Sequence, residues 1–166
     1  MEDTLKQTGA IAALLDEYIR SINDLIDVIN LISNEQLVRI IDENSEDEDC
    51  KSIQTILTHI IASGYIYTIE KEKHIGIVKS YPSKVFCNST NDYILQLNQM
   101  FDYCNAFFET NPLLNISESD NSKKILVSWG QLYDIEQLME HAIVHVLRHR
   151  RQIENFIKKQ NELHTF

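Results

Sequence analysis

The chain has 166 residues, with 15 Lys plus Arg against 25 Asp plus Glu, which gives a formal net charge of −10. Hydrophobic residues make up 43% and charged residues 24% of the sequence, a composition typical of one globular domain over residues 1–166. The negative charge disfavours binding to nucleic acid or to a membrane surface, because both are anionic. The sequence has no apolar run near the ~20 residues that span a bilayer, no signal-peptide pattern and no paired cysteine spacing, so we expect a cytoplasmic protein.

The periodicity of apolar residues predicts long helices, and only 4 Gly and 2 Pro interrupt the chain. Near the amino terminus the apolar spacing alternates between four and three, which draws one stripe along a helix. The stripe consists of Ile11, Leu15, Tyr18, Ile22, Leu25, Ile29 and Ile32. Ser33 and Gln36 then have capping-box spacing and predict a short helical turn. The acidic residues 42–49 are interpreted as a solvated loop, since the residue order of an EF-hand calcium loop is missing.

The second long helix is predicted to begin after Ser52, whose hydroxyl suits a helix cap. It runs over about residues 53–73, and apolar side chains cover so much of its circumference that we expect it to be deeply buried. Residues 74–91 contain Gly and Pro and lack helical periodicity. They are interpreted as a long crossover connection and not as a hairpin between antiparallel neighbours.

A third long helix is predicted from about Asp92, capped by Ser89 or Thr90, to Asn111. The connection that follows contains one short β-like run over residues 125–127. After it the last helix begins and continues almost to the end of the chain.

The last helix is predicted from Asp134, with Gln137 at capping-box spacing, to about Gln160. The chain then contains four main helices, which predicts an all-α fold. A four-helix bundle with long crossover connections is the natural architecture for that number and length of helices.

The last helix carries three histidines at a constant interval: His141, His145 and His149. Side chains four residues apart lie above one another on a helix, close enough for two imidazoles to share a metal ion. Relative to the apolar stripe of this helix, His149 points inward, His145 lies at the edge and His141 is nearest to solvent. A metal site inside the fold would therefore use His145 and His149, with His141 at its rim.

A third ligand must come from another helix, and His59 on the second long helix is the best-placed residue. His74 at the end of that helix and His164 near the carboxyl terminus are less well placed. The direction of His59 does not follow from periodicity, because its helix is apolar on too many sides. Three neutral imidazoles around Zn²⁺ or a similar ion leave a fourth position for water or substrate, as in catalytic sites. Histidines that only make hydrogen bonds within the core are the alternative.

Other common sites lack their motifs. The residue after His141 is Ala and the residue after His145 is Val, whereas a zincin needs Glu there. No Glu is followed three residues later by His, which excludes the di-iron pattern of ferritin-like bundles. The strings GxGxxG, GxxxxGK and GxSxG are also absent, so dinucleotide, P-loop and hydrolase-elbow chemistry are disfavoured.

The segment ILTHIIAS contains His59, and the segment HAIVHVLRHRRQI spans residues 141–153. Together with the order of predicted helices, they resemble the DinB/YfiT-like family of metalloenzymes, whose motif near the end is H-x-x-x-H-x-x-H-H-R-G-Q-I. The sequence departs from the family pattern at Arg151, where Gly is usual, at Arg148, where His is common, and at Val144, where Asn is common. None of the three departures removes a histidine that the family uses as a ligand.

The resemblance implies a four-helix bundle with up-down-down-up connectivity and a divalent metal ion held by His59, His145 and His149. Zinc or nickel is the expected ion, with manganese or iron as alternatives. Characterised members of the family include thiol-dependent S-transferases. Family members are often dimers, and the apolar first helix is compatible with a homodimer.

The leading hypothesis is an S-transferase whose metal site activates a low-molecular-weight thiol as the small-molecule substrate. A hydrolase that uses metal-bound water is one alternative, and a non-catalytic metal-binding bundle is the other. Arg148, Arg150 and Arg151 are the basic residues nearest to the site in sequence and are able to meet a carboxylate on the thiol. In an acidic protein, arginines more often pair with surface carboxylates.

Overall fold

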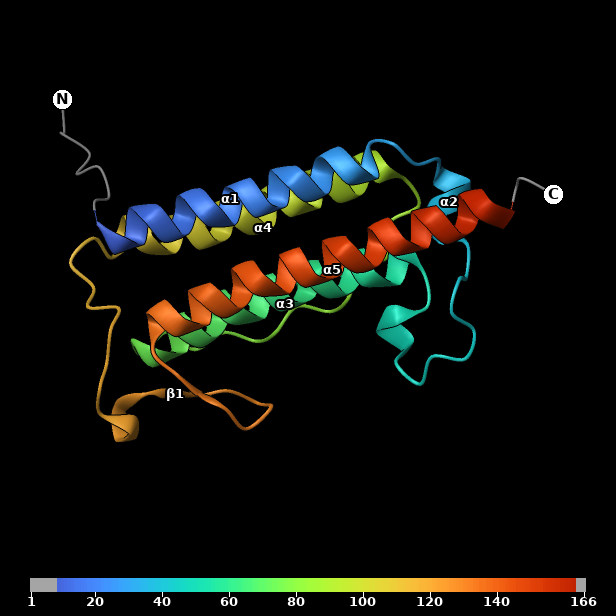
Figure 1. Ribbon diagram of the computed structural model, residues 1–166. Coiled ribbons are helices and arrows are strands. Elements are labelled where there is room, and N and C mark those ends of the chain that lie inside the picture. The colour runs from blue at the N-terminus through green and yellow to red at the C-terminus, as the bar shows by residue number, and fades with distance from the viewer. Residues whose placement is uncertain (1–8, 164–166) are drawn as a thin grey trace, which may run out of the picture.

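The computed structural model describes residues 9–163. Four long α-helices dominate this part of the chain: α1 (Ala10–Ile29), α3 (Ile53–His74), α4 (Thr90–Thr110) and α5 (Ile135–Leu163) (Figure 1). The shorter elements are α2 (Asn34–Val38), the 3₁₀ helices η1 (Glu48–Cys50) and η2 (Asn121–Lys123), and the paired strands β1 (Ile125–Leu126) and β2 (Leu132–Tyr133). The prediction of a mostly helical chain is confirmed. No helix in this described part is both long enough and apolar enough to cross a lipid bilayer.

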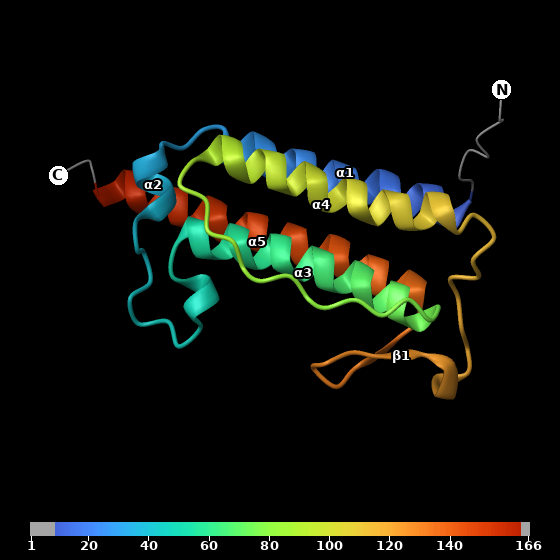
Figure 2. The same cartoon turned by 180° about the vertical axis from the view of Figure 1, so that it is seen from behind.

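Each long helix packs against two of the others: α1 against α4 and α5, and α3 against α4 and α5. Figures 1 and 2 show that α1 and α5 run in one direction and that α3 and α4 run in the opposite direction. The apolar faces of the helices meet in one core, whose fully buried members include Ile22, Leu25, Ile56, Leu97 and Leu138. This packing sets α3 and α5 against each other, so side chains from both helices can share one site.

Polar caps account for the first residue of four helices. The side chains of Ser33, Ser52 and Ser89 each accept a hydrogen bond from the backbone N–H three residues later. Asp134 and Gln137 cap each other reciprocally at the start of α5. A cap satisfies an N–H group that has no partner within the helix, so these side chains set where each helix begins. The predicted helix starts are thereby confirmed to within about two residues.

Residues 75–89 form the predicted crossover, an extended segment without helix or strand that runs along α3 (Figure 2). Lys79 forms an ion pair with Glu72 at 2.6 Å, and Tyr81 donates a hydrogen bond to Glu70. Because these contacts cover one face of α3, Glu70 and Glu72 are buried although both are acidic. The crossover therefore explains why α3 is buried on nearly every side.

Strands β1 and β2 form a small hairpin that leads into α5. The β-like run at residues 125–127 supplies β1, whereas the sequence did not indicate β2 as a strand. Gly130 lies between the strands with φ 85°, a left-handed conformation that glycine adopts without steric cost. The hairpin holds Trp129 and Tyr133 beside the first turns of α5, where their ring centroids lie 5.6 and 5.4 Å from that of His141.

Candidate metal centre

Three imidazoles converge between α3 and α5. His59 comes from α3, and His145 and His149 come from successive turns of α5. One ring nitrogen from each histidine lies within 4.8 Å of those of the other two, and His59 Nε2 lies 3.0 Å from His145 Nε2. Nitrogens bound to one Zn²⁺ at about 2.0–2.1 Å lie within about 4.2 Å of one another, so small side-chain rotations would bring this set into range. The structure thus brings together the three histidines that the sequence singled out.

The three rings lie at different depths. His149 is buried, with 6% of its surface exposed, whereas His59 and His145 are half-buried. The position of the apolar stripe on α5 predicts that His149 is more deeply buried than His145, as the structure shows. The direction of His59 is decided by the packing of α3 on α5, which puts its ring centroid 4.9 Å from that of His145 and 5.0 Å from that of His149. The cluster therefore has a buried base and a side that faces solvent.

Oxygen partners orient two of the imidazoles. Asp49 Oδ2 accepts a hydrogen bond from His59 Nδ1 at 3.1 Å, and Gln152 Oε1 accepts one from His149 Nδ1 at 3.0 Å. Because Nδ1 carries the proton in both rings, Nε2 has the lone pair; the Nε2 of His59 lies within hydrogen-bond distance of His145 Nε2. Lys84 lies in the crossover, and its Nζ donates a hydrogen bond to Asp49 Oδ2 at 2.6 Å. An oxygen behind each imidazole is the arrangement that fixes tautomer and ring direction in metal-binding histidines.

The surroundings keep the α5 rings neutral. Burial lowers the pKa of His145 to about 2, and the neighbouring imidazoles of His149 and His59 act in the same direction. Burial also lowers the pKa of His149, and the hydrogen bond to Gln152 opposes this effect. Neutral imidazole is the form that binds a metal ion, so neither ring has to lose a proton at physiological pH.

A cavity of about 450 Å³ adjoins the cluster. Its lining consists of Asp47, Cys50, His59, His145, Arg148, His149, Arg151, Gln152 and Asn155. Among the described residues, no fourth ligand atom joins the three histidines. Three protein ligands beside a cavity leave room for a substrate atom at an ion, which is typical of catalytic and not of structural sites.

Cys50 lines this cavity, and its thiol contacts oxygen atoms of two other lining residues. Its Sγ contacts Asp47 Oδ2 at 3.3 Å and Gln152 Oε1 at 3.9 Å. Burial raises the pKa of the Cys50 thiol; the hydrogen bond to Gln152 opposes this effect, and the hydrogen bond to Asp47 adds to it. The side chain is therefore held as a thiol, and a thiol is a much poorer nucleophile and metal ligand than a thiolate.

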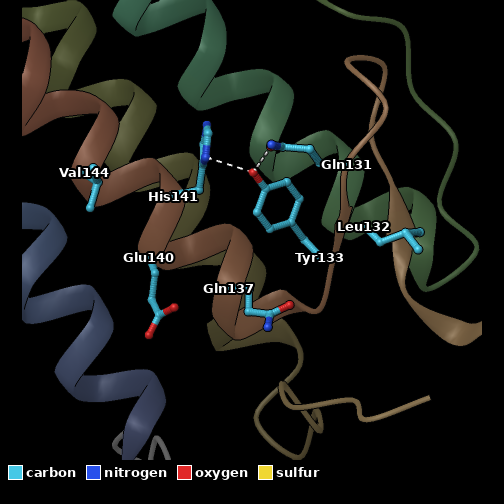
Figure 3. A pocket seen from close by; sticks show the side chains of 7 residues that line it. All are labelled: Gln131, Leu132, Tyr133, Gln137, Glu140, His141 and Val144. Carbon is cyan, nitrogen blue, oxygen red and sulfur yellow. Dashed lines mark hydrogen bonds between the residues drawn. The ribbon is translucent and has the colours of Figure 1, made fainter. Parts of the chain in front are cut away.

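His141 lies outside the cluster, in a neighbouring pocket of about 550 Å³ (Figure 3). Its Nδ1 is 3.1 Å from Tyr133 Oη, and its ring stacks on Trp129. The ring centroid of His141 is 6.2 Å from that of His145. His141 thus belongs to an aromatic group beside the metal centre, as expected for a residue at the rim. His74 is exposed and away from the cluster, and His164 lies outside the described residues.

Sequence reasoning missed the two charged residues that support His59. Residues 42–49 mostly lack helix and strand, as predicted, but Asp49 enters η1 and reaches His59. Lys84 reaches the same carboxylate from the middle of the crossover. Asp49 stands three residues before Ser52, which caps the helix that carries His59. This proximity in sequence was the one indication that Asp49 lies near His59. Nothing in the sequence indicated Lys84, because the contact joins residues that are 35 positions apart.

Replacing Asp49 by asparagine is expected to weaken metal binding by about 10–100-fold, the usual cost of losing an oxygen partner behind a histidine ligand. Competition with a chromophoric chelator measures the dissociation constant. Glu48→Gln is the matched control, because Glu48 is an adjacent, exposed carboxylate that pairs with Lys51 and not with a histidine. Equal affinities of D49N and wild-type protein would show that Asp49 does not support the site.

No model of a protein family matches the sequence, and a search of curated proteins finds no match. The resemblance to the DinB/YfiT-like family therefore rests on the sequence motif and the order of the helices.

Proposed function

We propose that this protein is a divalent-metal-dependent enzyme of the DinB/YfiT-like type, in which His59, His145 and His149 hold the ion. The observation that carries the proposal is the convergence of three imidazoles beside an open cavity. Two of them are oriented by oxygen partners on Nδ1, as metal-binding histidines usually are. Three imidazole nitrogens suit zinc or nickel best, with manganese or iron as alternatives.

The proposed architecture is a four-helix bundle with up-down-down-up connectivity. The common direction of α1 and α5, opposite to that of α3 and α4, supports this topology (Figure 1). The extended crossover at residues 75–89 supports it too, because neighbouring helices that run the same way need a long connection.

The proposed reaction is transfer of a low-molecular-weight thiol to an electrophilic acceptor. A divalent ion held by these histidines would lower the pKa of a thiol in the cavity. The thiolate would then form the new carbon–sulfur bond as the acceptor loses its leaving group, and the thiol proton would pass to solvent. Asp49 and Gln152 hold the imidazoles in their binding orientation. The state of Cys50 favours an added thiol over an internal nucleophile, because burial raises the pKa of the only cysteine that lines the cavity.

Metal analysis and a thiol assay test the proposal together. Protein purified without a His tag should contain about one divalent ion per chain. The loaded protein should speed the reaction of 2-mercaptoethanol with 1-chloro-2,4-dinitrobenzene, and His145→Ala should not. Hydrolysis of 4-nitrophenyl acetate without any thiol, in the absence of thiol transfer, would contradict the transferase and favour a hydrolase. Protein that binds no divalent ion would contradict both and leave a helical scaffold with histidines in its core.

A further inference from the structure

Helix α5 carries three neighbouring arginines, Arg148, Arg150 and Arg151, whose surroundings differ. Arg150 points away from the cavity and forms ion pairs with Asp24 at 2.5 Å and with Glu154 at 3.5 Å. Arg148 and Arg151 line the cavity beside the three histidines. Within residues 9–163, neither of these two guanidinium groups forms an ion pair or a hydrogen bond. The arginines nearest to the metal centre are thus the ones that remain available to a ligand.

Arg148 and Arg151 are both exposed, so water can satisfy their guanidinium groups when no ligand is bound. The one acidic residue in the cavity lining outside the metal cluster is Asp47. Its carboxylate accepts hydrogen bonds from the backbone N–H of Asp49 and from Cys50 Sγ. The lining therefore contains two positively charged arginines and one negatively charged carboxylate, which already accepts two hydrogen bonds. A bound divalent ion would make the charge of the cavity more positive still. The cavity has the opposite charge to the protein as a whole.

The positions of the two arginines suit one ligand that also reaches the histidines. Arg148 follows His145 by three residues and precedes His149 by one, and its charge contributes to the lowered pKa of both rings. Arg151 stands three residues after Arg148, so the two side chains leave α5 on the same flank. Asn155, one turn further along, extends this polar flank of the cavity.

We propose that Arg148 and Arg151 form a carboxylate-binding subsite, which holds the anionic end of the substrate while its reactive atom lies at the three-histidine centre. The proposal rests on the proposed function, since it takes the metal centre as the place of reaction. A guanidinium group matches a carboxylate with two parallel hydrogen bonds, which fixes the orientation of the ligand as well as its position. The subsite then selects thiols that carry a carboxylate over neutral or cationic thiols.

Binding of three small thiols to the nickel-loaded protein tests the subsite without any turnover. The thiols are 3-mercaptopropionate, 2-mercaptoethanol and cysteamine, whose distal ends are anionic, neutral and cationic. Absorbance from thiolate bound to nickel reports binding, and nickel content is measured separately. Because the thiols differ in intrinsic affinity for nickel, the informative quantity is the ratio of their dissociation constants in each variant.

In the wild-type protein, 3-mercaptopropionate should bind at least about tenfold more tightly than cysteamine. The double variant R148Q/R151Q should bind nickel as before and lose most of this preference. Arg150→Gln is the matched control, because it removes an arginine of the same helix that lies outside the cavity, and it should keep the preference.

An unchanged preference in R148Q/R151Q would overturn the subsite and leave the metal-dependent transferase intact. A preference lost equally in R150Q would also overturn it, because general surface charge would then be the cause. If nickel binds but no thiol gives the absorbance, both the subsite and the thiol-transfer proposal fail. If the protein binds no nickel and no other divalent ion, the metal centre itself fails.

Discussion

His145→Ala is expected to weaken metal binding by more than about a hundredfold, so that the purified variant contains almost no ion. The loss of an oxygen partner behind a ligand already costs about 10–100-fold, and the loss of the ligand itself costs more. Only three imidazoles converge among the described residues, and two of them cannot retain an ion as three do. Elemental analysis gives the metal content, and competition with a chelator gives the dissociation constant.

His59→Ala should cause the same loss, although His59 lies on a different helix, because its Nε2 is only 3.0 Å from His145 Nε2. His141→Ala is the matched control: it removes an imidazole one turn before His145, in the neighbouring pocket (Figure 3). Circular dichroism shows whether each variant keeps its helices. A helical H145A protein that retains a full complement of metal would refute the ligand assignment.

The metal-free protein is expected to lose stability as the pH falls below about 6.5. Burial lowers the pKa of His145 from 6.5 to about 2 and also lowers that of His149. Between the folded and unfolded pKa values the unfolded chain binds more protons, so acid favours unfolding in that window. Each additional proton that the unfolded chain binds lowers the free energy of unfolding by at most about 1.4 kcal/mol for each unit by which the pH falls. The expected loss from His145 is therefore about 2 kcal/mol between pH 6.5 and about pH 4.5.

Denaturant unfolding in the presence of EDTA, repeated across this pH range, measures the effect. His145→Gln is the informative variant, because glutamine does not titrate and the dependence of the unfolding free energy on pH should become shallower. The carboxylates Asp47 and Asp120 have lowered pKa values and lose their contribution at more acidic pH, below about 4. A pH dependence that is identical in H145Q and wild-type protein would show that His145 titrates normally in the folded state.

The helices were predictable because their signals are local. A serine such as Ser52 or Ser89 caps the helix that starts directly after it, and the hydrogen bond spans three residues. The stacking of His145 above His149 follows from helix geometry alone, as does the greater depth of His149. The strand β2 was missed because two residues are too few to show an alternating pattern, and its pairing depends on the turn at Gly130.

The sequence by itself determined the helical class of this protein, the starts of α3, α4 and α5 and the shared face of the α5 histidines, because all three depend on neighbours within one or two helical turns. Only the tertiary structure decided that His59 faces α5, since α3 is apolar on too many sides for its phase to be read. It also decided that Asp49 and Lys84 support His59, and that Arg150 pairs with Asp24 across 126 positions of sequence. These contacts depend on how separate segments pack, and no local pattern of residues encodes that.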